Sequence, residues 1–294
     1  MANILVIGRS GQLARALADA PAPDGLRLDC RGRDSFDLAD IASIAPRLAT
    51  LAPAAVINAA AFNAVDKAEA DDTAAMALNA HAVAALARAC AVTDTPFVHV
   101  STDYVFDGDK GAPYVEDDAT GPINAYGRSK LAGERAALAA GGRVAVIRTS
   151  WVHSADGAGF VQTMIRLARE RGAVDLVEDQ HGRPTWAPDL ADAALLLARQ
   201  LLDRAPAAAG IFHYSGAGDA TRADWGEQVL AEFAARGGPR AVARRIRSAD
   251  FFAAAPRPRD TRLDCPRWLA LDGACGLRDW RDGVARCVAA ITRT

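Results

Sequence analysis

The stretch NILVIGRSGQLA, residues 3–14, joins a short apolar run to a turn that carries two glycines. The run Asn3–Ile7 predicts a buried strand, and Gln12–Ala20 has the composition of a helix. The pattern G-x-x-G-x-x-A between them places Gly8 at a tight turn and Gly11 where the backbone must leave room. Ala14 is small enough for the helix to approach the strand. Because a helix N-terminus attracts anions, this stretch favours a strand–turn–helix unit that holds a pyrophosphate.

The same alternation of strands and helices continues through the first half of the chain. Further strands are predicted at Leu26–Cys30, Ala54–Asn58, Phe97–Ser101 and Val144–Thr149, and helices at Thr73–Ala91 and Asn124–Ala140. Strands that alternate with helices of ten or more residues predict βαβ units. Right-handed crossovers then give an α/β fold with a doubly wound parallel sheet of the Rossmann type.

The regular alternation of strands and helices ends after Ser150. Helices are predicted at Phe160–Arg171, Asp189–Arg204, Trp225–Arg236 and Trp280–Ile291, strands at Val174–Val177 and Gly210–Tyr214, and an extended Pro/Arg-rich stretch at Ala253–Arg262. We therefore predict a dinucleotide-binding domain over residues 1–152, with returning elements near 189–215. Residues 153–294 are expected to form mainly a smaller C-terminal lobe that binds the substrate.

Charge and composition exclude several classes of protein. The 294 residues contain 34 Lys+Arg and 36 Asp+Glu, a net charge of −2, without a basic block that would favour nucleic acid. The apolar runs are interrupted by polar residues, so neither a membrane span nor a signal peptide is expected. The five cysteines are scattered without a CxxC pair, which argues against a disulfide framework or a zinc site. We expect a soluble cytoplasmic protein.

Residues 101–130 carry the groups best suited to chemistry. Ser101, Thr102 and Asp103 end a predicted strand, where an α/β sheet presents side chains to a ligand. Tyr126 and Lys130 lie at i and i+4 on one face of a predicted helix. A cation one turn away favours the phenolate, so we expect Lys130 to lower the Tyr126 pKa from its usual ~10. With a hydroxyl from Thr102 or Ser101 beside the phenol, the set predicts proton donation to a carbonyl that receives hydride from a nicotinamide cofactor.

The sequence leaves both nicotinamide dinucleotides open. Asp29 closes the second predicted strand, where a carboxylate would accept hydrogen bonds from the adenosine ribose. Arg9, Arg31 and Arg33 lie close by in sequence and would instead neutralise a 2′-phosphate. The small residues 59–61 after the third strand would let a flat dinucleotide lie near the backbone.

Four longer motifs are STDYVFDG at 101–108, YGRSKLAGE at 126–134, RTSWVH at 148–153 and DQHGRPTWAPDLAD at 179–192. These motifs resemble those of the extended short-chain dehydrogenase/reductase superfamily, and within it the dTDP-4-dehydrorhamnose reductases. The matching runs follow in order over nearly the whole chain. The resemblance implies reduction of the C4 ketone of dTDP-4-dehydro-β-L-rhamnose to dTDP-L-rhamnose, with NADPH or NADH as cofactor and a nucleotide sugar as the only partner.

The resemblance also implies residue roles. Tyr126 would be the proton donor, supported by Lys130 and Thr102. The expected substrate-binding residues are Thr102, Asp103, Tyr126 and Trp151. The expected cofactor-binding residues are Gly8, Gly11, Gln12, Leu13, Asp29, Asp37, Leu38, Ala61, Phe62, Asn63 and Lys130.

The sequence departs from the family at a few positions. Some members dimerise through a magnesium ion held by glutamates, whereas the corresponding places here carry Ala16 and Pro188, which cannot ligate a metal. We therefore expect no bound metal and a monomer or weak homodimer. Asn63 stands where the family often has threonine.

Two alternative functions stay open at this point. One is another nucleotide-sugar epimerase, dehydratase or reductase of the same superfamily. The other is a non-catalytic, dinucleotide-binding regulatory subunit. A binding module of that kind has no chemical need for Tyr126, Lys130 and Thr102 together.

Overall fold

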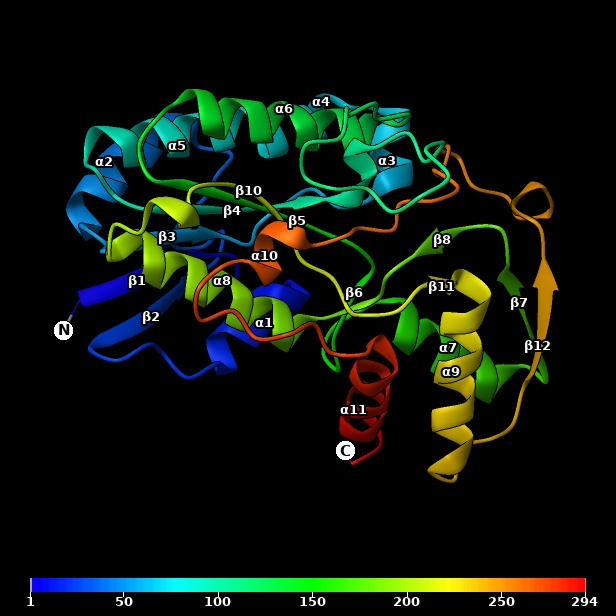
Figure 1. Cartoon of the computed structure of the whole chain (residues 1–294). Helices are drawn as coiled ribbons and strands as arrows, with labels where there is room; N and C mark the ends of the chain where they lie inside the picture. Colours follow the sequence, from blue (N-terminus) through cyan, green and yellow to red (C-terminus); the bar gives the residue numbers. More distant parts are fainter. Residues whose placement is uncertain (1, 294) are drawn as a thin grey trace.

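A six-stranded parallel sheet forms the centre of the computed structural model, which describes residues 2–293 (Figure 1). Its order is β2–β1–β3–β4–β5–β10. The strands span Leu26–Arg31 (β2), Ala2–Ile7 (β1), Ala55–Asn58 (β3), Phe97–Thr102 (β4), Val144–Thr149 (β5) and Gly210–His213 (β10). The chain runs outward from β1 to β2 and then crosses back to β3. This reversal between β1 and β3 opens a crevice at the carboxyl ends of the strands and confirms the predicted doubly wound α/β class.

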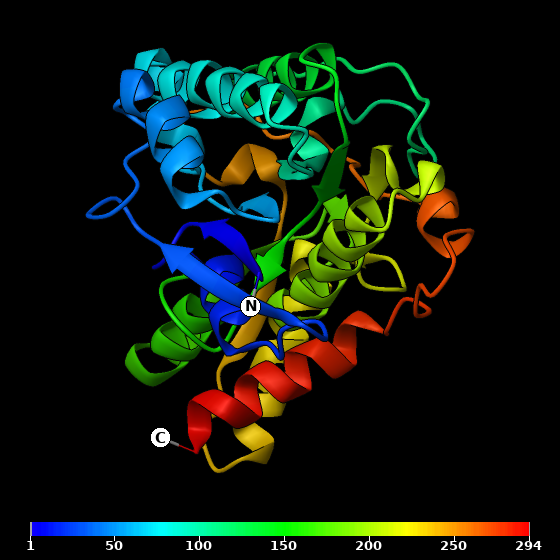
Figure 2. The same cartoon turned by 90° about the vertical axis from the view of Figure 1, so that its left-hand side faces the viewer.

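Helices cover both faces of the sheet. The pair α1 (Gln12–Asp19) and α8 (Ala187–Leu202) packs on one face, and α2 (Ile41–Leu51), α5 (Ala82–Val92) and α6 (Ala125–Ala139) pack on the other (Figures 1 and 2). Residues 4–7 of β1 are all buried because both faces of the strand are covered. Two apolar cores result, one under each layer of helices.

The predicted helix Thr73–Ala91 contains a wider turn that its sequence does not reveal. It consists of α4 (Thr73–Met76), a π-helical turn η1 (Ala77–His81) and α5. Gly133 of α6 lies so close to this turn that a Cβ there would be 2.0 Å from the Asn79 carbonyl oxygen. The segment Thr73–Val92 has the length and apolar composition of a membrane span, but half of its most apolar window is buried. Its contacts with α2 and α6 are those of a core helix.

A second lobe packs beside the carboxyl edge of the sheet. Its helices are α7 (Phe160–Glu170), α9 (Arg222–Ala235) and α11 (Trp280–Thr292), and its core contains the fully buried Trp225. Short strands pair as β6 (Val152–His153) with β9 (Thr185–Trp186), β7 (Ala173–Val177) with β12 (Val242–Ile246), and β8 (His181–Gly182) with β11 (Ala220–Thr221). The helix α8 and the strand β10, in the segment predicted to return near 189–215, belong to the sheet and its helix layer.

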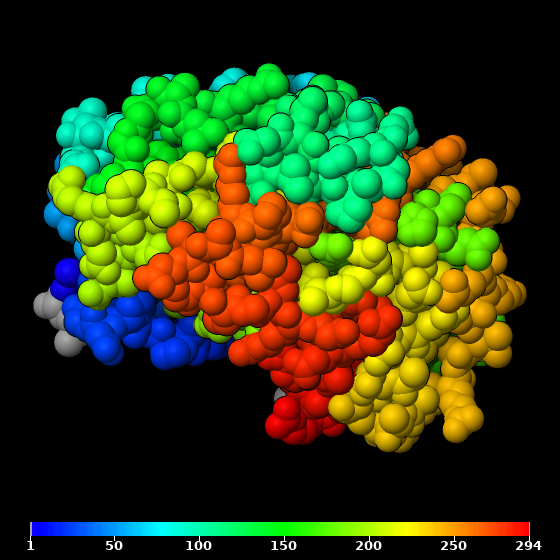
Figure 3. Space-filling view, in the orientation of Figure 1, coloured from blue at the N-terminus to red at the C-terminus, as the bar shows by residue number. Residues whose placement is uncertain are grey.

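The remaining elements are short. They are α3 (Val65–Ala70), α10 (Pro266–Leu269) and the 3-10 turns η2 (Asp103–Val105), η3 (Pro206–Ala208) and η4 (Ser248–Asp250). Residues 251–264 carry no helix or strand, which confirms the predicted extended stretch. After residue 250 the orange chain runs along the surface from the second lobe to the yellow-green part of the first (Figure 3).

The sequence-based prediction misses the helices α2, α3 and α10 and the strands β6, β8, β9, β11 and β12. The helix α2 contains Pro46, which lacks the N–H that an interior helical position donates. The strand β12 reads VARRI, is mostly exposed and pairs with β7 at the edge of a two-stranded sheet. The apolar residues Ile41, Ile44, Leu48 and Leu51 of α2 do follow helical spacing, but Pro46 interrupts the segment, and VARRI shows no alternation of apolar and polar residues.

Candidate active site

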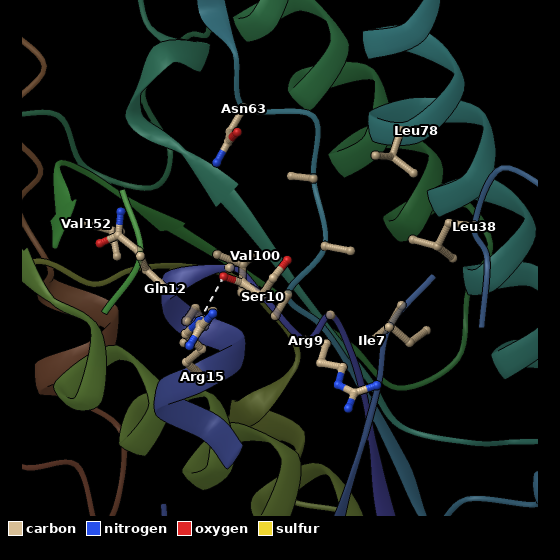
Figure 4. A pocket seen from close by; sticks show the side chains of 18 of the residues that line it. Ile7, Arg9, Ser10, Gln12, Arg15, Leu38, Asn63, Leu78, Val100 and Val152 are labelled. Carbon is tan, nitrogen blue, oxygen red and sulfur yellow. Dashed lines mark hydrogen bonds between the residues drawn. The ribbon is translucent and has the colours of Figure 1, made fainter. Parts of the chain in front are cut away.

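A cavity of about 1160 Å³ opens at the carboxyl ends of β1, β3 and β4. Its wall is built from the turn after β1, the end of β2, residues 59–63, the end of β4, helix α6 and the segment around Trp151 (Figure 4). Segments far apart in the sequence meet here because parallel strands present their carboxyl ends at one edge.

The glycine turn after β1 forms one end of the cavity. Gly8 has φ +132°, and a Cβ there would lie 3.1 Å from the Ala14 Cβ, so a side chain is excluded. Gly11 is the N-cap of α1 and supplies no side-chain cap, which leaves the first N–H groups of the helix available to an anion. Gln12, Leu13 and Arg15 also line this end, and the Arg15 Nε donates to the Ser10 carbonyl at 3.2 Å (Figure 4).

The space in front of Gly11 is open, as a bound diphosphate would require. A Cβ at Gly11 would meet no atom within 4 Å, so this room is not used by the protein's own packing. We expect Gly11→Ala to fold like the parent but to bind NADPH at least about tenfold more weakly, since the methyl group occupies the space that the diphosphate needs. Isothermal titration calorimetry and thermal unfolding measure the two effects.

Gly172 provides the matched control, because a Cβ there also meets nothing within 4 Å and the residue lies outside the cavity lining. Gly172→Ala should change neither affinity nor melting temperature. Equal NADPH affinity in Gly11→Ala and the parent would contradict a diphosphate at this turn.

The end of the cavity near β2 differs from the sequence-based expectation at Asp29. Strand β2 pairs Ile7 with Arg31, so Asp29 lies two residues before the strand end and does not line the cavity. Its carboxylate accepts hydrogen bonds from the Arg31 guanidinium at 3.0 Å. The lining residues are Arg9, Arg31, Gly32, Arg33, Asp34, Phe36, Asp37 and Leu38. Asp37 and Leu38 are thus brought to the cavity, while Asp29 acts on it only through Arg31.

The loop after β3 places Ala61 and Asn63 in the cavity wall but turns Phe62 away. The Phe62 side chain packs with the apolar cluster of Ala68, Ala75 and Ala125. Its backbone N–H donates to Asn79 Oδ1 at 2.8 Å, and its carbonyl accepts from Asn79 Nδ2 at 2.9 Å. Sequence reasoning missed Asn79, for which the only signal is a lone amide in an apolar helix.

Thr102, Asp103, Tyr126, Lys130 and Trp151 all line the same cavity. The Thr102 hydroxyl donates to Asp103 Oδ1 at 3.0 Å and hydrogen-bonds the Tyr126 side chain. The second Asp103 oxygen accepts from the Thr261 hydroxyl at 2.5 Å. Burial raises the pKa of Asp103 to about 6, although both hydroxyl contacts oppose that shift. The neighbouring Ser101 hydroxyl is buried without a partner among the described residues.

The prediction that Lys130 lowers the Tyr126 pKa is wrong for this structure. Desolvation in the cavity wall raises the pKa of Tyr126, and the hydrogen bond with Thr102 offsets only part of that rise. The Lys130 amine donates to the Val100 carbonyl at 2.6 Å, and burial lowers the pKa of Lys130 to about 8. A phenol with a raised pKa stays protonated, which suits a proton donor.

Trp151 forms a rigid part of the wall. Its φ of +46° is rare for a bulky residue, and strain of this kind is typical of functional sites. The indole stacks on Trp225 with 5.5 Å between ring centroids, and the Arg222 guanidinium lies 3.9 Å from the Trp151 ring centroid. A Cβ on the facing Gly182 would be 2.4 Å from the indole. These contacts leave the ring little freedom.

A buried ion pair lies between helix α6 and strand β5. Arg148 of β5 and Glu134 of α6 are 2.8 Å apart and expose 3% and 1% of their side chains. Two hydrogen bonds from Nε and one from Nη2 of Arg148 reach the carboxylate. The pair ties α6, which carries Tyr126 and Lys130, to the sheet.

No three His, Cys, Asp or Glu side chains within residues 2–293 are arranged to hold a metal ion. Ala16 lies on α1 and Pro188 in the first turn of α8, and neither offers a ligand atom.

Comparison with known proteins places the chain among relatives that it matches end to end. The family model described as RmlD substrate binding domain matches residues 1–293. A dTDP-4-dehydrorhamnose reductase of Sinorhizobium fredii is 40% identical, over 98% of this chain and 97% of its own. A Streptomyces antibioticus protein named as a probable dTDP-4,6-dihydroxy-2-methyloxan-3-one 4-ketoreductase is 39% identical, over 95% of this chain and 92% of its own.

A comparison with solved structures gives the same family as the sequence comparison. The dTDP-4-dehydrorhamnose reductase of Bacillus anthracis, in complex with NADP, has a TM-score of 0.90 and 29% identity, and the match covers 98% of this chain and 99% of that one. The chain therefore belongs to the RmlD substrate binding domain family, together with the dTDP-4-dehydrorhamnose reductases that it resembles over their full length.

Proposed function

We propose that this chain catalyses the NAD(P)H-dependent reduction of the C4 ketone of dTDP-4-dehydro-β-L-rhamnose to dTDP-L-rhamnose. The observation that carries the proposal is the convergence of Tyr126, Lys130 and Thr102 on one cavity that begins at the glycine turn. The names of the full-length relatives support the same reaction.

The cofactor, when bound, supplies a hydride to the ketone carbon. Gly8, Gly11, Gln12 and Leu13 would hold its diphosphate, and Lys130 its nicotinamide ribose. Asp37 and Leu38 would lie at the adenosine half, and Ala61 and Asn63 on the path toward the nicotinamide. All of these residues line the cavity, as does the Arg9, Arg31 and Arg33 group.

The protein's own contribution is the proton and the orientation of the ketone. The Tyr126 hydroxyl donates its proton to the C4 oxygen as the carbon receives hydride, so the ketone becomes an alcohol. The Thr102 hydroxyl, which donates to Asp103 in this structure, would turn its hydrogen to the same oxygen and stabilise its developing charge. Solvent then returns a proton to the Tyr126 phenolate, while Lys130 would support the reaction by holding the nicotinamide ribose. Asp103 orients Thr102, and Trp151 would pack against the sugar.

This proposal assigns the dinucleotide to residues 1–152 and the nucleotide sugar mainly to residues 153–294. A small, soluble nucleotide sugar is expected as the only partner, and the enzyme would act in the cytoplasm as a monomer or weak homodimer. Neither nucleic acid nor a membrane enters the reaction.

A second candidate is reduction of a different dTDP-linked keto sugar, favoured by the Streptomyces antibioticus relative. A regulatory subunit is disfavoured because the full acid–base set lines the cavity.

Purified protein is mixed with dTDP-4-dehydrorhamnose and either NADPH or NADH, and loss of reduced-nicotinamide absorbance is followed. We expect turnover with at least one cofactor. Folded protein that turns over with neither would reject the proposal, while a higher kcat/KM for the alternative keto sugar would favour the second candidate.

A further inference from the structure

His99 is a fully buried residue of β4 for which the proposed reaction has no use. It does not line the cavity, yet it lies directly behind a residue that does. Its Nδ1 is 3.2 Å from Asn58 Nδ2 of β3, and its Nε2 is 3.5 Å from Lys130 Nζ of α6.

The neighbours of His99 determine where its ring hydrogen sits. The Ala60 N–H donates to Asn58 Oδ1 at 3.1 Å, which fixes the orientation of the amide and turns its NH₂ group toward His99. The His99 Nδ1 must therefore accept a hydrogen bond. Burial and the nearby Lys130 charge hold the pKa of His99 well below its usual value, so the ring is neutral. Its single hydrogen is on Nε2 and faces the lysine amine.

This arrangement restricts the Lys130 ammonium, which has three hydrogens and no lone pair. It cannot donate to an Nε2 atom that carries a hydrogen. One of its hydrogens instead goes to the Val100 carbonyl at 2.6 Å, and the remaining hydrogens turn away from the ring. The amine lines the cavity, so that direction leads to the cofactor site.

Few other charges act on Lys130. Glu134, one turn further along α6, favours the ammonium, but its carboxylate is paired with Arg148 of β5. Asn58 of β3 and Asn79 of the π-helical turn are uncharged. Burial disfavours the ammonium, and the polar hydrogen that faces the amine from the sheet side is the His99 Nε2–H.

We propose that His99 is a positioning residue for Lys130. Asn58 holds the His99 Nε2–H toward the Lys130 amine, and this N–H keeps the hydrogens of the amine on the cavity side. The same contact makes the Lys130 amine bind a proton less tightly. The His99 tautomer and its effect on Lys130 in the ligand-free protein do not depend on the proposed reaction. Their consequence for catalysis rests on that reaction.

The first test observes the parent protein and uses a variant only to assign signals. Nitrogen-15 NMR of the labelled full-length protein reports the tautomer of each histidine, with His99→Gln identifying the His99 signals. We expect a neutral His99 ring with hydrogen on Nε2 from pH 6 to 9, a range of about three units around neutrality. An Nδ1–H tautomer or an imidazolium would overturn the proposal.

The second test uses the small number of lysines, which are Lys67, Lys110 and Lys130. Lysine labelled with carbon-13 at Cε gives three signals, two of them from exposed side chains, and Lys130→Arg identifies the third. His99→Leu removes the facing N–H, so the Lys130 pKa should rise by about half to one unit. His99→Gln, whose amide can accept from Asn58 and direct N–H toward Lys130, should restore the parent value.

His153→Leu is the control, because His153 is also a buried histidine but packs against Trp186 and Trp225 in the second lobe. It should leave the Lys130 titration unchanged. A folded His99→Leu protein with the parent Lys130 pKa would contradict the proposal, whatever the outcome of the turnover assay. If turnover is found, the alkaline limb of kcat/KM should move upward in His99→Leu and return in His99→Gln.

Discussion

Tyr126→Phe lowers kcat by about 10²- to 10⁴-fold and leaves NADPH affinity close to that of the parent. The change removes the proton donor but keeps the ring, which packs edge-on against Tyr104 with 5.9 Å between centroids. Stopped-flow or steady-state turnover with dTDP-4-dehydrorhamnose measures the rate, and calorimetry measures the affinity. The raised pKa of Tyr126 means that the parent enzyme holds the donated proton throughout the neutral range.

Tyr114→Phe is the matched control for loss of a phenolic hydroxyl. Tyr114 is buried and donates to Asp107 at 2.6 Å, but it lies outside the cavity lining. This variant should lose some stability and keep kcat near the parent value. Comparable rates in Tyr126→Phe and the parent would mean that another group donates the proton.

Glu134→Ala destabilises the fold by about 3–5 kcal/mol, because it leaves the Arg148 guanidinium buried without its partner. Urea unfolding followed by circular dichroism measures the free energy. Loss of the Glu134–Arg148 ion pair should also weaken the attachment of α6 to β5 and therefore lower turnover. The double variant Glu134→Leu/Arg148→Met should recover most of the stability, since two apolar groups of similar size need no counter-charge.

The control is Glu170→Ala, which removes an exposed i, i+4 partner of Arg166. It should cost only about 0.3–0.5 kcal/mol. Equal losses for Glu134→Ala and Glu170→Ala would show that the buried pair contributes no more than a surface contact.

Local sequence patterns were sufficient to predict those site residues that lie within a single helix, strand or turn. The spacing of Tyr126 and Lys130 predicts a shared helix face, and both residues line the cavity. The strand end at Thr102 and the glycine turn at Gly8 were predicted for the same reason, since each depends on backbone geometry over a few residues. Short apolar runs also predicted the six strands of the sheet, although not their order across it.

The tertiary structure alone decided which of the remaining side chains reach the cavity. The register of β2 against β1 moves Asp29 back from the edge and brings Arg31 to it. The π-helical turn directs Asn79 to the backbone of Phe62, which turns that ring away. Burial, which no local pattern reports, raises the Tyr126 pKa and brings His99 against Lys130. Register, desolvation and such contacts depend on atoms contributed by segments far apart in the chain, whereas periodicity records only what neighbouring residues do.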